Sequence, residues 1–331
     1  MKANRRDFVR GACSLAALNA LGLASAARAQ SGVETARVLV GFSPGGTTDN
    51  VSRRIAEGLR TGYARTGVVE NRAGAGGRLA IEQMRIAPAD GSTLLLTPAS
   101  MITIYPHIYK KLSYDPLSDL QPVSTACQTA FGLGVGPAVP ATVRTLQEFN
   151  AWCKANRTQA NYGSPAAGSV PHFLGVLLGR AGGFEFQHVA FRGSQPALID
   201  MMGGQLPAVS APVGEFLPHL GTGKVRMLAT SGATRSTFMP DVPTYTEQGF
   251  KELEYAEWFG IFLPGKAAPD AVQRLAGAIQ SIVKTPEYVA GIAQMGLDPV
   301  SSSPAEFGKT IRSGFEEWRP IVKEIGFTAE S

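Results

Sequence analysis

The sequence of 331 residues lacks the patterns that membrane-spanning, zinc-binding and nucleic-acid-binding proteins require. No apolar run reaches the roughly 18 residues of a transmembrane helix. Neither H-E-x-x-H nor C-x-x-C occurs, and the four histidines are scattered. After residue 29 there is no run of basic residues and no basic stripe interleaved with aromatics. We therefore expect a soluble protein without a metal site or a nucleic-acid partner.

Nucleotide-binding patterns are incomplete as well. The cluster Gly74 to Leu79 lacks the third glycine of a dinucleotide fingerprint. Gly223-Lys224 is followed by Val225, where a P-loop needs serine or threonine. We therefore expect no cofactor.

The first 29 residues are predicted to be a signal peptide rather than part of the fold. Arg5 and Arg6 precede an apolar run at 15–24, and Ala29 fits signal-peptidase cleavage. Together with Phe8, the paired arginines resemble a twin-arginine signal, and an ordinary secretory signal is the alternative. Without this segment the formal net charge falls from +5 to about +1, because it holds five basic residues and one acidic residue. We expect the mature protein to lie in the periplasm as a monomer.

Two cysteines, Cys127 and Cys153, remain after this leader. The periplasm permits disulfides, so the two may be predicted to pair. Equally, each fits a small buried apolar residue, because Cys127 falls in an apolar strand and Cys153 on a helix. The sequence leaves both alternatives open.

Short apolar runs alternate with helical patterns along the chain, which is typical of α/β folds with parallel sheets. Predicted strands include 38–40, 93–97, 131–135, 186–190, 225–230 and 254–263. Predicted helices are 48–60, 78–86, 145–155, 169–180, 194–202, 213–220, 269–284 and 303–322. About 300 mature residues exceed what one core usually holds, so we expect two lobes. Lobe 1 is predicted at 30–125 plus 232–331 and lobe 2 at 126–231, with crossing strands near 122–128 and 225–231.

The clearest local signal is a glycine-rich corner between the strand at 38–40 and the helix at 48–60. We expect Thr47 or Thr48 to be the N-cap of this helix, with Asp49 in its first turn. Gly45 and Gly46 carry no Cβ, so an anion can approach the backbone N–H groups where the helix dipole favours negative charge. A plain tight turn is the alternative for this corner alone.

Two later corners repeat this chemistry. The segment 161–169 ends in small residues, with Ser169 as expected N-cap of the next helix and Pro171 in its first turn. The segment 191–196 adds Arg192, whose forked guanidinium suits a carboxylate. Three such corners suggest a cleft between lobes that holds an acidic ligand.

A hydrolase interpretation deserves one test, because Gly41 to Gly45 matches the G-x-S-x-G nucleophile elbow around Ser43. Asp200 and His219 follow in the order of a catalytic triad. In the elbow, however, the residue after the serine donates its N–H to the oxyanion, and Pro44 has no N–H. Losing one such donor costs about 3 kcal/mol of transition-state stabilisation, so we expect a protein that is not an enzyme.

Taken in order, the segments of the mature chain resemble the Bug family of periplasmic solute-binding proteins, the receptors of tripartite tricarboxylate transporters. Among the segments that carry the resemblance are Phe42 to Asp49, Val69 to Gly77, Ala89 to Leu96, Tyr109 to Pro116, Tyr162 to Ser164, Asp200 to Gln205 and Pro240 to Thr244. Their number and order make the match more specific than any single motif.

The resemblance implies a two-lobed α/β periplasmic-binding-protein fold of type II, a Venus flytrap, which closes on a small carboxylate. Membrane subunits of a tripartite tricarboxylate transporter would then receive the ligand. An orphan binding protein that presents its ligand to a sensor is the alternative, and a serine hydrolase using Ser43 is the least favoured. Few acids in lobe 2 argue against an amino-acid ligand, whose ammonium group would need a carboxylate. We expect an acid with an uncharged tail or with several carboxylates.

The ligand-binding residues that the resemblance implies fall on the three corners. They are Phe42, Ser43, Gly45, Gly46, Thr47, Thr48 and Asp49 in the first, Gly163, Ser164, Gly168 and Ser169 in the second, and Arg192, Gly193 and Ser194 in the third. Ser100, which follows the strand at 93–97, is a further expected contact.

Overall fold

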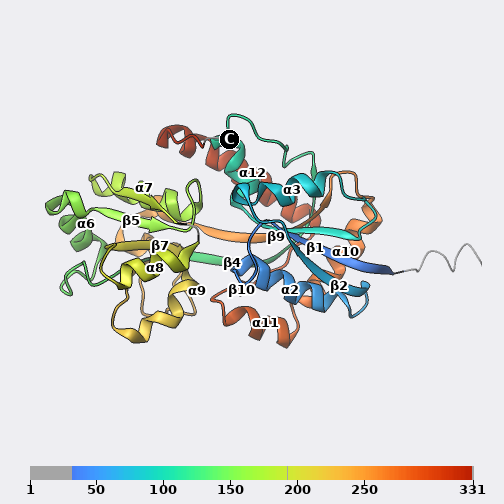
Figure 1. The fold of residues 1–331 in the computed structure, drawn as a ribbon, viewed down its shortest axis with the longest axis horizontal. Helices are drawn as coiled ribbons and strands as arrows, with labels where there is room; N and C mark the ends of the chain where they lie inside the picture. The colour runs from blue at the N-terminus through green and yellow to red at the C-terminus, as the bar shows by residue number, and fades with distance from the viewer. Residues whose placement is uncertain (1–31, 192, 330–331) are drawn as a thin grey trace, which may run out of the picture.

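A computed structural model describes residues 32–191 and 193–329 of the chain (Figure 1). The expected signal peptide at 1–29 and the expected ligand contact Arg192 lie outside these residues. Within the part described, no helix is both long enough and apolar enough to cross a membrane.

The described strands and helices alternate along the chain. The strands are β1 Val33–Val40, β2 Ala64–Asn71, β3 Thr93–Pro98, β4 Leu120–Val135, β5 Asn161–Ser164, β6 Gln187–Ala190, β7 Ala208–Pro212, β8 Arg226–Thr230, β9 Ala256–Pro264 and β10 Asp298–Pro299. The α-helices are α2 Thr47–Leu59, α3 Arg78–Arg85, α4 Ser100–Thr103, α5 Tyr105–Ile108, α6 Leu146–Ala155, α7 Val170–Gly182, α8 Ser194–Met202, α9 Val213–Phe216, α10 Pro269–Ile282, α11 Pro286–Ala293 and α12 Pro304–Ile325.

The strands form two groups that share the long strand β4 (Figure 1). In the first lobe, β2, β1 and β3 are parallel, and the antiparallel strand β9 follows them in the order β2-β1-β3-β9-β4. In the second lobe, β7, β5 and β6 are parallel, and β7 and β8 pair with the end of β4. Each sheet is therefore parallel in its outer half, and antiparallel strands connect the two lobes.

The strand β4 changes partners along its length. Its first part, from Leu120 to Ala130, pairs with β9, and its last part, from Phe131 to Val135, pairs with β7 and β8. The predicted crossing strand at 122–128 lies within the first part, and the one at 225–231 contains β8. The predicted limits of the two lobes stay a prediction.

Helix positions follow from the apolar periodicity and from the caps. In α2, Val51, Ile55 and Leu59 recur on one face, and all three are buried. The last helix, α12, begins with a capping box between Ser303 and Glu306. It ends at Gly326, whose φ of 72° is a left-handed conformation that glycine adopts without strain.

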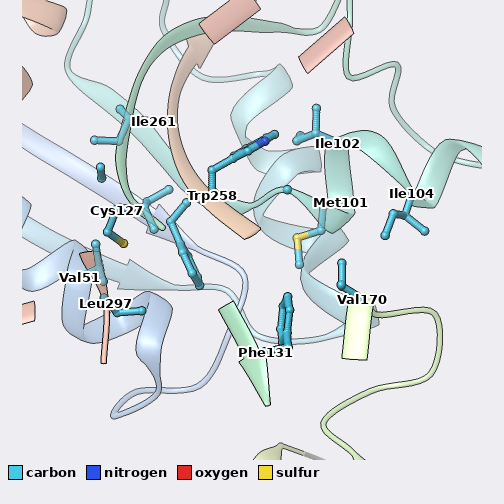
Figure 2. Packing of buried hydrophobic residues seen from close by; sticks show 14 of the residues in the cluster. Val51, Met101, Ile102, Ile104, Cys127, Phe131, Val170, Trp258, Ile261 and Leu297 are labelled. Carbon is cyan, nitrogen blue, oxygen red and sulfur yellow. The ribbon is translucent and has the colours of Figure 1, made fainter. Parts of the chain in front are cut away.

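A large apolar cluster runs through both lobes and the strands between them. It includes Ile55 of the first lobe and Phe149 of the second, and a smaller cluster around Phe216 completes the second lobe. Figure 2 shows Phe131 of β4 and Trp258 of β9 as members of the large cluster, both from strands that connect the lobes. Because this cluster is packed continuously, it fixes the positions of the carboxyl ends of the parallel strands relative to β4 and β9.

The structure confirms most predicted elements and corrects some. Helix α8 has the predicted bounds, 194–202, whereas the predicted helix at 213–220 is one α-helical turn, α9, followed by a 3-10 helix. The elements α4, α5, α11, β7 and β10 were not predicted from the sequence. Cys127 and Cys153 are both buried free thiols, which favours the apolar interpretation over a disulfide.

Candidate functional site

Three loops of the first lobe converge at the carboxyl ends of its parallel strands. The loop after β1 passes so close to the glycine cluster after β2 that a Cβ on Gly41 would lie 2.6 Å from Gly77 Cα. Gly77 in turn approaches Met101, which follows β3. Glycine at position 41 is therefore required by close approach of the backbones, and glycine at position 77 by its left-handed φ of 93°. The predicted residues at 42–49 and Ser100 thus lie at the same edge of the sheet, because β1 and β3 are paired neighbours.

Asp49 holds the first loop in place from inside. Its carboxylate is 1% exposed and accepts hydrogen bonds from the Gly45 N–H at 2.9 Å, from Asn71 at 2.9 Å and from Arg53 at 2.8 Å. Burial by itself raises the pKa of Asp49, but the bonds from Arg53, Gly45 and Asn71 outweigh burial and leave the pKa below its ordinary value. Asp49 is therefore ionised and fully engaged within the protein, and it shapes the loop.

The start of α2 differs from the expected one. Neither Thr47 nor Thr48 is the N-cap: the cap is Gly46, with φ −78° and ψ 172°, and no side chain caps the helix. The residue before this cap, Gly45, has a φ of 87°, a left-handed conformation that favours glycine. This tight turn brings the chain to Gly46, and the helix starts at the next residue. The first N–H groups of α2 have no intrahelical acceptor, so those of Thr47 and Thr48 remain available to an anion.

Four helix starts outside the three corners are closed by a side chain or by proline. Thr145, Thr285 and Ser303 cap α6, α11 and α12 with their side chains. Helix α10 starts with Pro269, which has no N–H to satisfy. No side chain caps α2, α7 or α8, which start at the three predicted corners, and the same holds for α3 and for the one-turn helices α4, α5 and α9.

The second and third corners lie side by side at the carboxyl ends of β5 and β6. These strands are parallel, with Ser164 opposite Ala190. The Phe191 N–H donates to the Ser164 carbonyl at 2.9 Å, and the Gly193 N–H donates to the Pro165 carbonyl at 3.0 Å. Apart from Arg192, which lies outside the described residues, the predicted residues of both corners are thus brought together in the second lobe.

The hydroxyl groups of Ser164 and Ser169 in the second corner form hydrogen bonds within the protein. Ser164, which is fully buried, shares a hydrogen bond of 2.7 Å with His188 Nε2. Ser169 is the N-cap of α7 as predicted, but its hydroxyl donates to the Ala166 carbonyl at 2.7 Å instead of capping the helix. The ligand donors that this corner presents are therefore backbone N–H groups at the start of α7.

A pair of buried histidines, missed in the sequence, supports this loop. His172 Nδ1 accepts the Gly168 N–H at 3.0 Å, and the rings of His172 and His188 are 3.9 Å apart. Burial lowers the pKa of His172 to about 3, with a further contribution from His188, and lowers the pKa of His188 to about 4. Both rings are therefore neutral at physiological pH and act as fixed hydrogen-bond partners. Their separation by 16 positions in sequence gives no pattern by which to find them.

The second corner also touches the first lobe. A Cβ on Gly168, which has φ 75°, would lie 2.6 Å from Ile108 Cδ1 of α5. In the third corner, Gly193 at φ 104° is the N-cap of α8, and Ser194 is its first residue and is 7% exposed. Residues of both lobes thus frame the loops that end β5 and β6.

Ser100 has a partner that the sequence analysis did not identify. Its N–H and its hydroxyl both donate to Oε1 of Glu257 on β9, and the carboxyl of Glu257 is buried. Burial raises the pKa of Glu257 to about 7, although the hydrogen bonds from Ser100 act in the opposite direction. An acid within the otherwise apolar run at 256–264 was the signal for this residue in the sequence.

The described residues show neither a catalytic triad around Ser43 nor a metal site, and the cavity lies away from the three corners. Among the described residues, no hydrogen bond joins Ser43 to His219 or Asp200, and no cluster of three metal-ligating side chains occurs. A cavity of about 1120 Å³ lies between α2, α10 and α11, and none of the predicted ligand residues lines it. We therefore base the candidate site on the three helix starts rather than on cavity volume.

Comparison with known proteins identifies the family of the chain. The sequence model of the TctC family, described as the tripartite tricarboxylate transporter family receptor, matches residues 51–327. The protein BugT of Bordetella pertussis is 31% identical over 291 residues, which cover 88% of this chain and 89% of BugT.

Two solved structures of similar proteins contain dicarboxylates. The R. palustris protein Rpa4515 with adipate is 26% identical with a TM-score of 0.82, covering 90% of this chain and 99% of that chain. MatC from Rhodopseudomonas palustris with bound malate is 27% identical with a TM-score of 0.77, covering 88% and 99%. The fold is the two-lobed periplasmic-binding-protein fold, and the family consists of binding proteins, not enzymes. The chain belongs to the TctC family of tripartite tricarboxylate transporter receptors.

Proposed function

We propose that this protein is a periplasmic receptor for a small dicarboxylate, which it delivers to the membrane subunits of a tripartite tricarboxylate transporter. The observation that carries the proposal is the coincidence of three uncapped helix starts with the carboxyl ends of parallel strands in both lobes. Relatives with adipate and with malate support a ligand with two carboxylates.

In the proposed complex, one carboxylate accepts the N–H groups of Thr47 and Thr48 at the start of α2. The second carboxylate lies toward the start of α7 behind Ser169, or toward Gly193 and Ser194 of α8. A hydrogen bond to a charged group contributes about 1.5–3 kcal/mol, and a helix N-terminus adds a favourable dipole. A ligand that touches both lobes favours the closed arrangement by its differential affinity for that arrangement.

A thermal-shift screen tests this function. The panel comprises monocarboxylates, dicarboxylates, tricarboxylates, aromatic acids and amino acids. A dicarboxylate at 100 times its Kd is expected to stabilise the protein by about 2.7 kcal/mol, because it binds the folded state alone. If no acid raises the melting temperature, or if only amino acids do, the proposal is wrong.

A further inference from the structure

The carboxyl group of Glu257 lies where the first lobe meets the strands that connect the lobes. Glu257 is on β9, opposite Thr129 of β4. The next residue, Trp258, accepts the Ala99 N–H with its carbonyl, so Glu257 comes beside Ser100 at the end of β3. Because β3 pairs with β1, this is the edge that also carries the first ligand loop.

Only one oxygen of this carboxyl is used within the described part of the chain. Oε1 accepts both hydrogen bonds from Ser100, and Oε2 accepts none. Four side-chain oxygen atoms of the described residues are both sealed from solvent and unpaired, and they belong to Ser52, Asn150, Ser210 and Thr230. Since Oε2 is not one of them, it reaches accessible space although Glu257 is only 6% exposed.

The surroundings of Glu257 supply no positive charge. No lysine, arginine or histidine forms an ion pair with it among residues 32–191 and 193–329. The titratable groups that interact with it are the phenols of Tyr105 on α5 and Tyr255 just before β9, and burial raises the pKa of each phenol, so both are neutral. A buried acid with only neutral neighbours favours its protonated form, which is consistent with the raised pKa of Glu257.

We propose that Ser100 and Glu257 form a ligand subsite in which Oε2 of protonated Glu257 donates a hydrogen bond to a carboxylate oxygen of the bound dicarboxylate. Ser100 orients the carboxyl group by holding Oε1 as the acceptor, which leaves the acidic proton on Oε2. The ligand is then taken up together with one proton, held on Glu257. This inference rests on the proposed function. It names Glu257 as the group that recognises a carboxylate of the bound dicarboxylate.

The pH dependence of malate and adipate affinity tests this subsite. Calorimetric titrations at pH 6.5 and pH 8.5 use the wild type and the Glu257→Gln variant, whose amide is a donor at every pH. The ligand carboxyls stay ionised across this range. If only protonated Glu257 binds, the wild-type Kd rises about 20-fold between the two pH values, because the competent fraction falls by that factor. In Glu257→Gln the Kd stays constant within about twofold.

A second measurement needs the wild type alone. Titrations at pH 7.5 in two buffers with different ionisation enthalpies are expected to show net uptake of a proton on binding. Binding without pH dependence and without proton uptake overturns the subsite but leaves the dicarboxylate receptor intact. The same pH dependence in Glu257→Gln also overturns it, because the proton then binds elsewhere. If neither acid binds at either pH, both the subsite and the proposed function are wrong.

Discussion

Asp49 shows how one buried charge organises the loop between β1 and α2 through bonds within the protein. Its two carboxylate oxygens take up the Gly45 N–H, the Asn71 amide and the Arg53 guanidinium. The Gly45 N–H therefore donates to a partner within the protein. The N–H groups of Thr47 and Thr48, at the start of α2, have no acceptor within the helix. The loop is therefore preorganised before ligand arrives, which reduces the cost of binding.

Replacing Asp49 by asparagine is expected to weaken both folding and binding. An amide cannot accept three donors and leaves Arg53 without its ionic partner, so the free energy of unfolding should fall by about 2 kcal/mol. Because the pKa of Asp49 is lowered in the folded state, this contribution is present at neutral pH and is lost on acidification below the ordinary range of an aspartate. Urea denaturation at pH 7 and at a pH below the ordinary range of an aspartate measures it.

The control for Asp49→Asn is Glu57→Gln, about two turns further along α2. Glu57 pairs with Arg60 on the surface, where both side chains are largely exposed. Such pairs contribute about 0–1 kcal/mol, so this variant should unfold almost as the wild type does. Equal destabilisation by the two variants would show that Asp49 has no special role in the loop.

At the residue scale, the sequence identifies what local chemistry dictates. The position of Asp49 in the first turn of α2 was predicted from the apolar spacing of Val51, Ile55 and Leu59, and the structure confirms it. The contacts of Ser164 and Gly168 with His188 and His172 depend on how β5, β6 and α7 pack, which no short pattern encodes. Glu257 meets Ser100 across 157 positions of sequence, so its role required the strand register.

At the element scale, the helix starts differ in how their first N–H groups are satisfied. Threonine, serine and proline close the starts of α6, α10, α11 and α12, whereas no side chain caps α2, α7 or α8, whose N-cap residues are Gly46, Ser169 and Gly193. An open start forgoes about 1 kcal/mol of capping stabilisation. In the proposed complex, a ligand carboxylate compensates for this loss.

Thr47→Pro tests the open start of α2. Thr47 is the first helical residue, where proline is well accepted, and Gly46 before it has the extended conformation that a following proline requires. Proline deletes the Thr47 N–H without disturbing the helix. Affinity for the dicarboxylate identified in the screen should fall about 10- to 100-fold, as expected for one bond to a charged group.

Two matched variants accompany this measurement. Thr47→Ala removes the hydroxyl and keeps the N–H, so its affinity shows what the side chain contributes. Ser303→Ala removes the cap of α12 and is expected to lower stability by about 1 kcal/mol with unchanged affinity. If Thr47→Pro binds as tightly as Thr47→Ala, the N–H of Thr47 is not a ligand donor.

Most helices could be predicted because their apolar period and their caps are local. Helix α8 has its predicted bounds because Gly203 and Gly204 end it. The N-cap of α2 was predicted wrongly because Thr47 and Thr48 are good caps in general, whereas the loop geometry assigns this position to Gly46. Strand β7 was missed because the sequence Ala208–Pro212 is made of small residues and carries little apolar signal.

At the scale of the whole molecule, β4 and β9 join the lobes and α12 packs against both. Trp318 of α12 contacts Phe173 of α7 in the second lobe, and Phe307 of the same helix contacts Trp258 of β9. Two lobes were predictable from chain length, but the antiparallel register of β4 with β9 was not, because it depends on partners far apart in sequence. The candidate ligand loops of both lobes are thereby brought to the connecting strands.

This arrangement predicts that a ligand needs an acidic group at each end to engage both lobes. Isothermal titration of the wild-type protein at pH 6.5 with adipate, malate and the monocarboxylate hexanoate tests that claim most directly. We expect one dicarboxylate to bind per chain, at least about tenfold more tightly than hexanoate, since one charged contact contributes more than 1.4 kcal/mol. Equal affinity for hexanoate and the dicarboxylates, or no binding by any of them, would contradict the account.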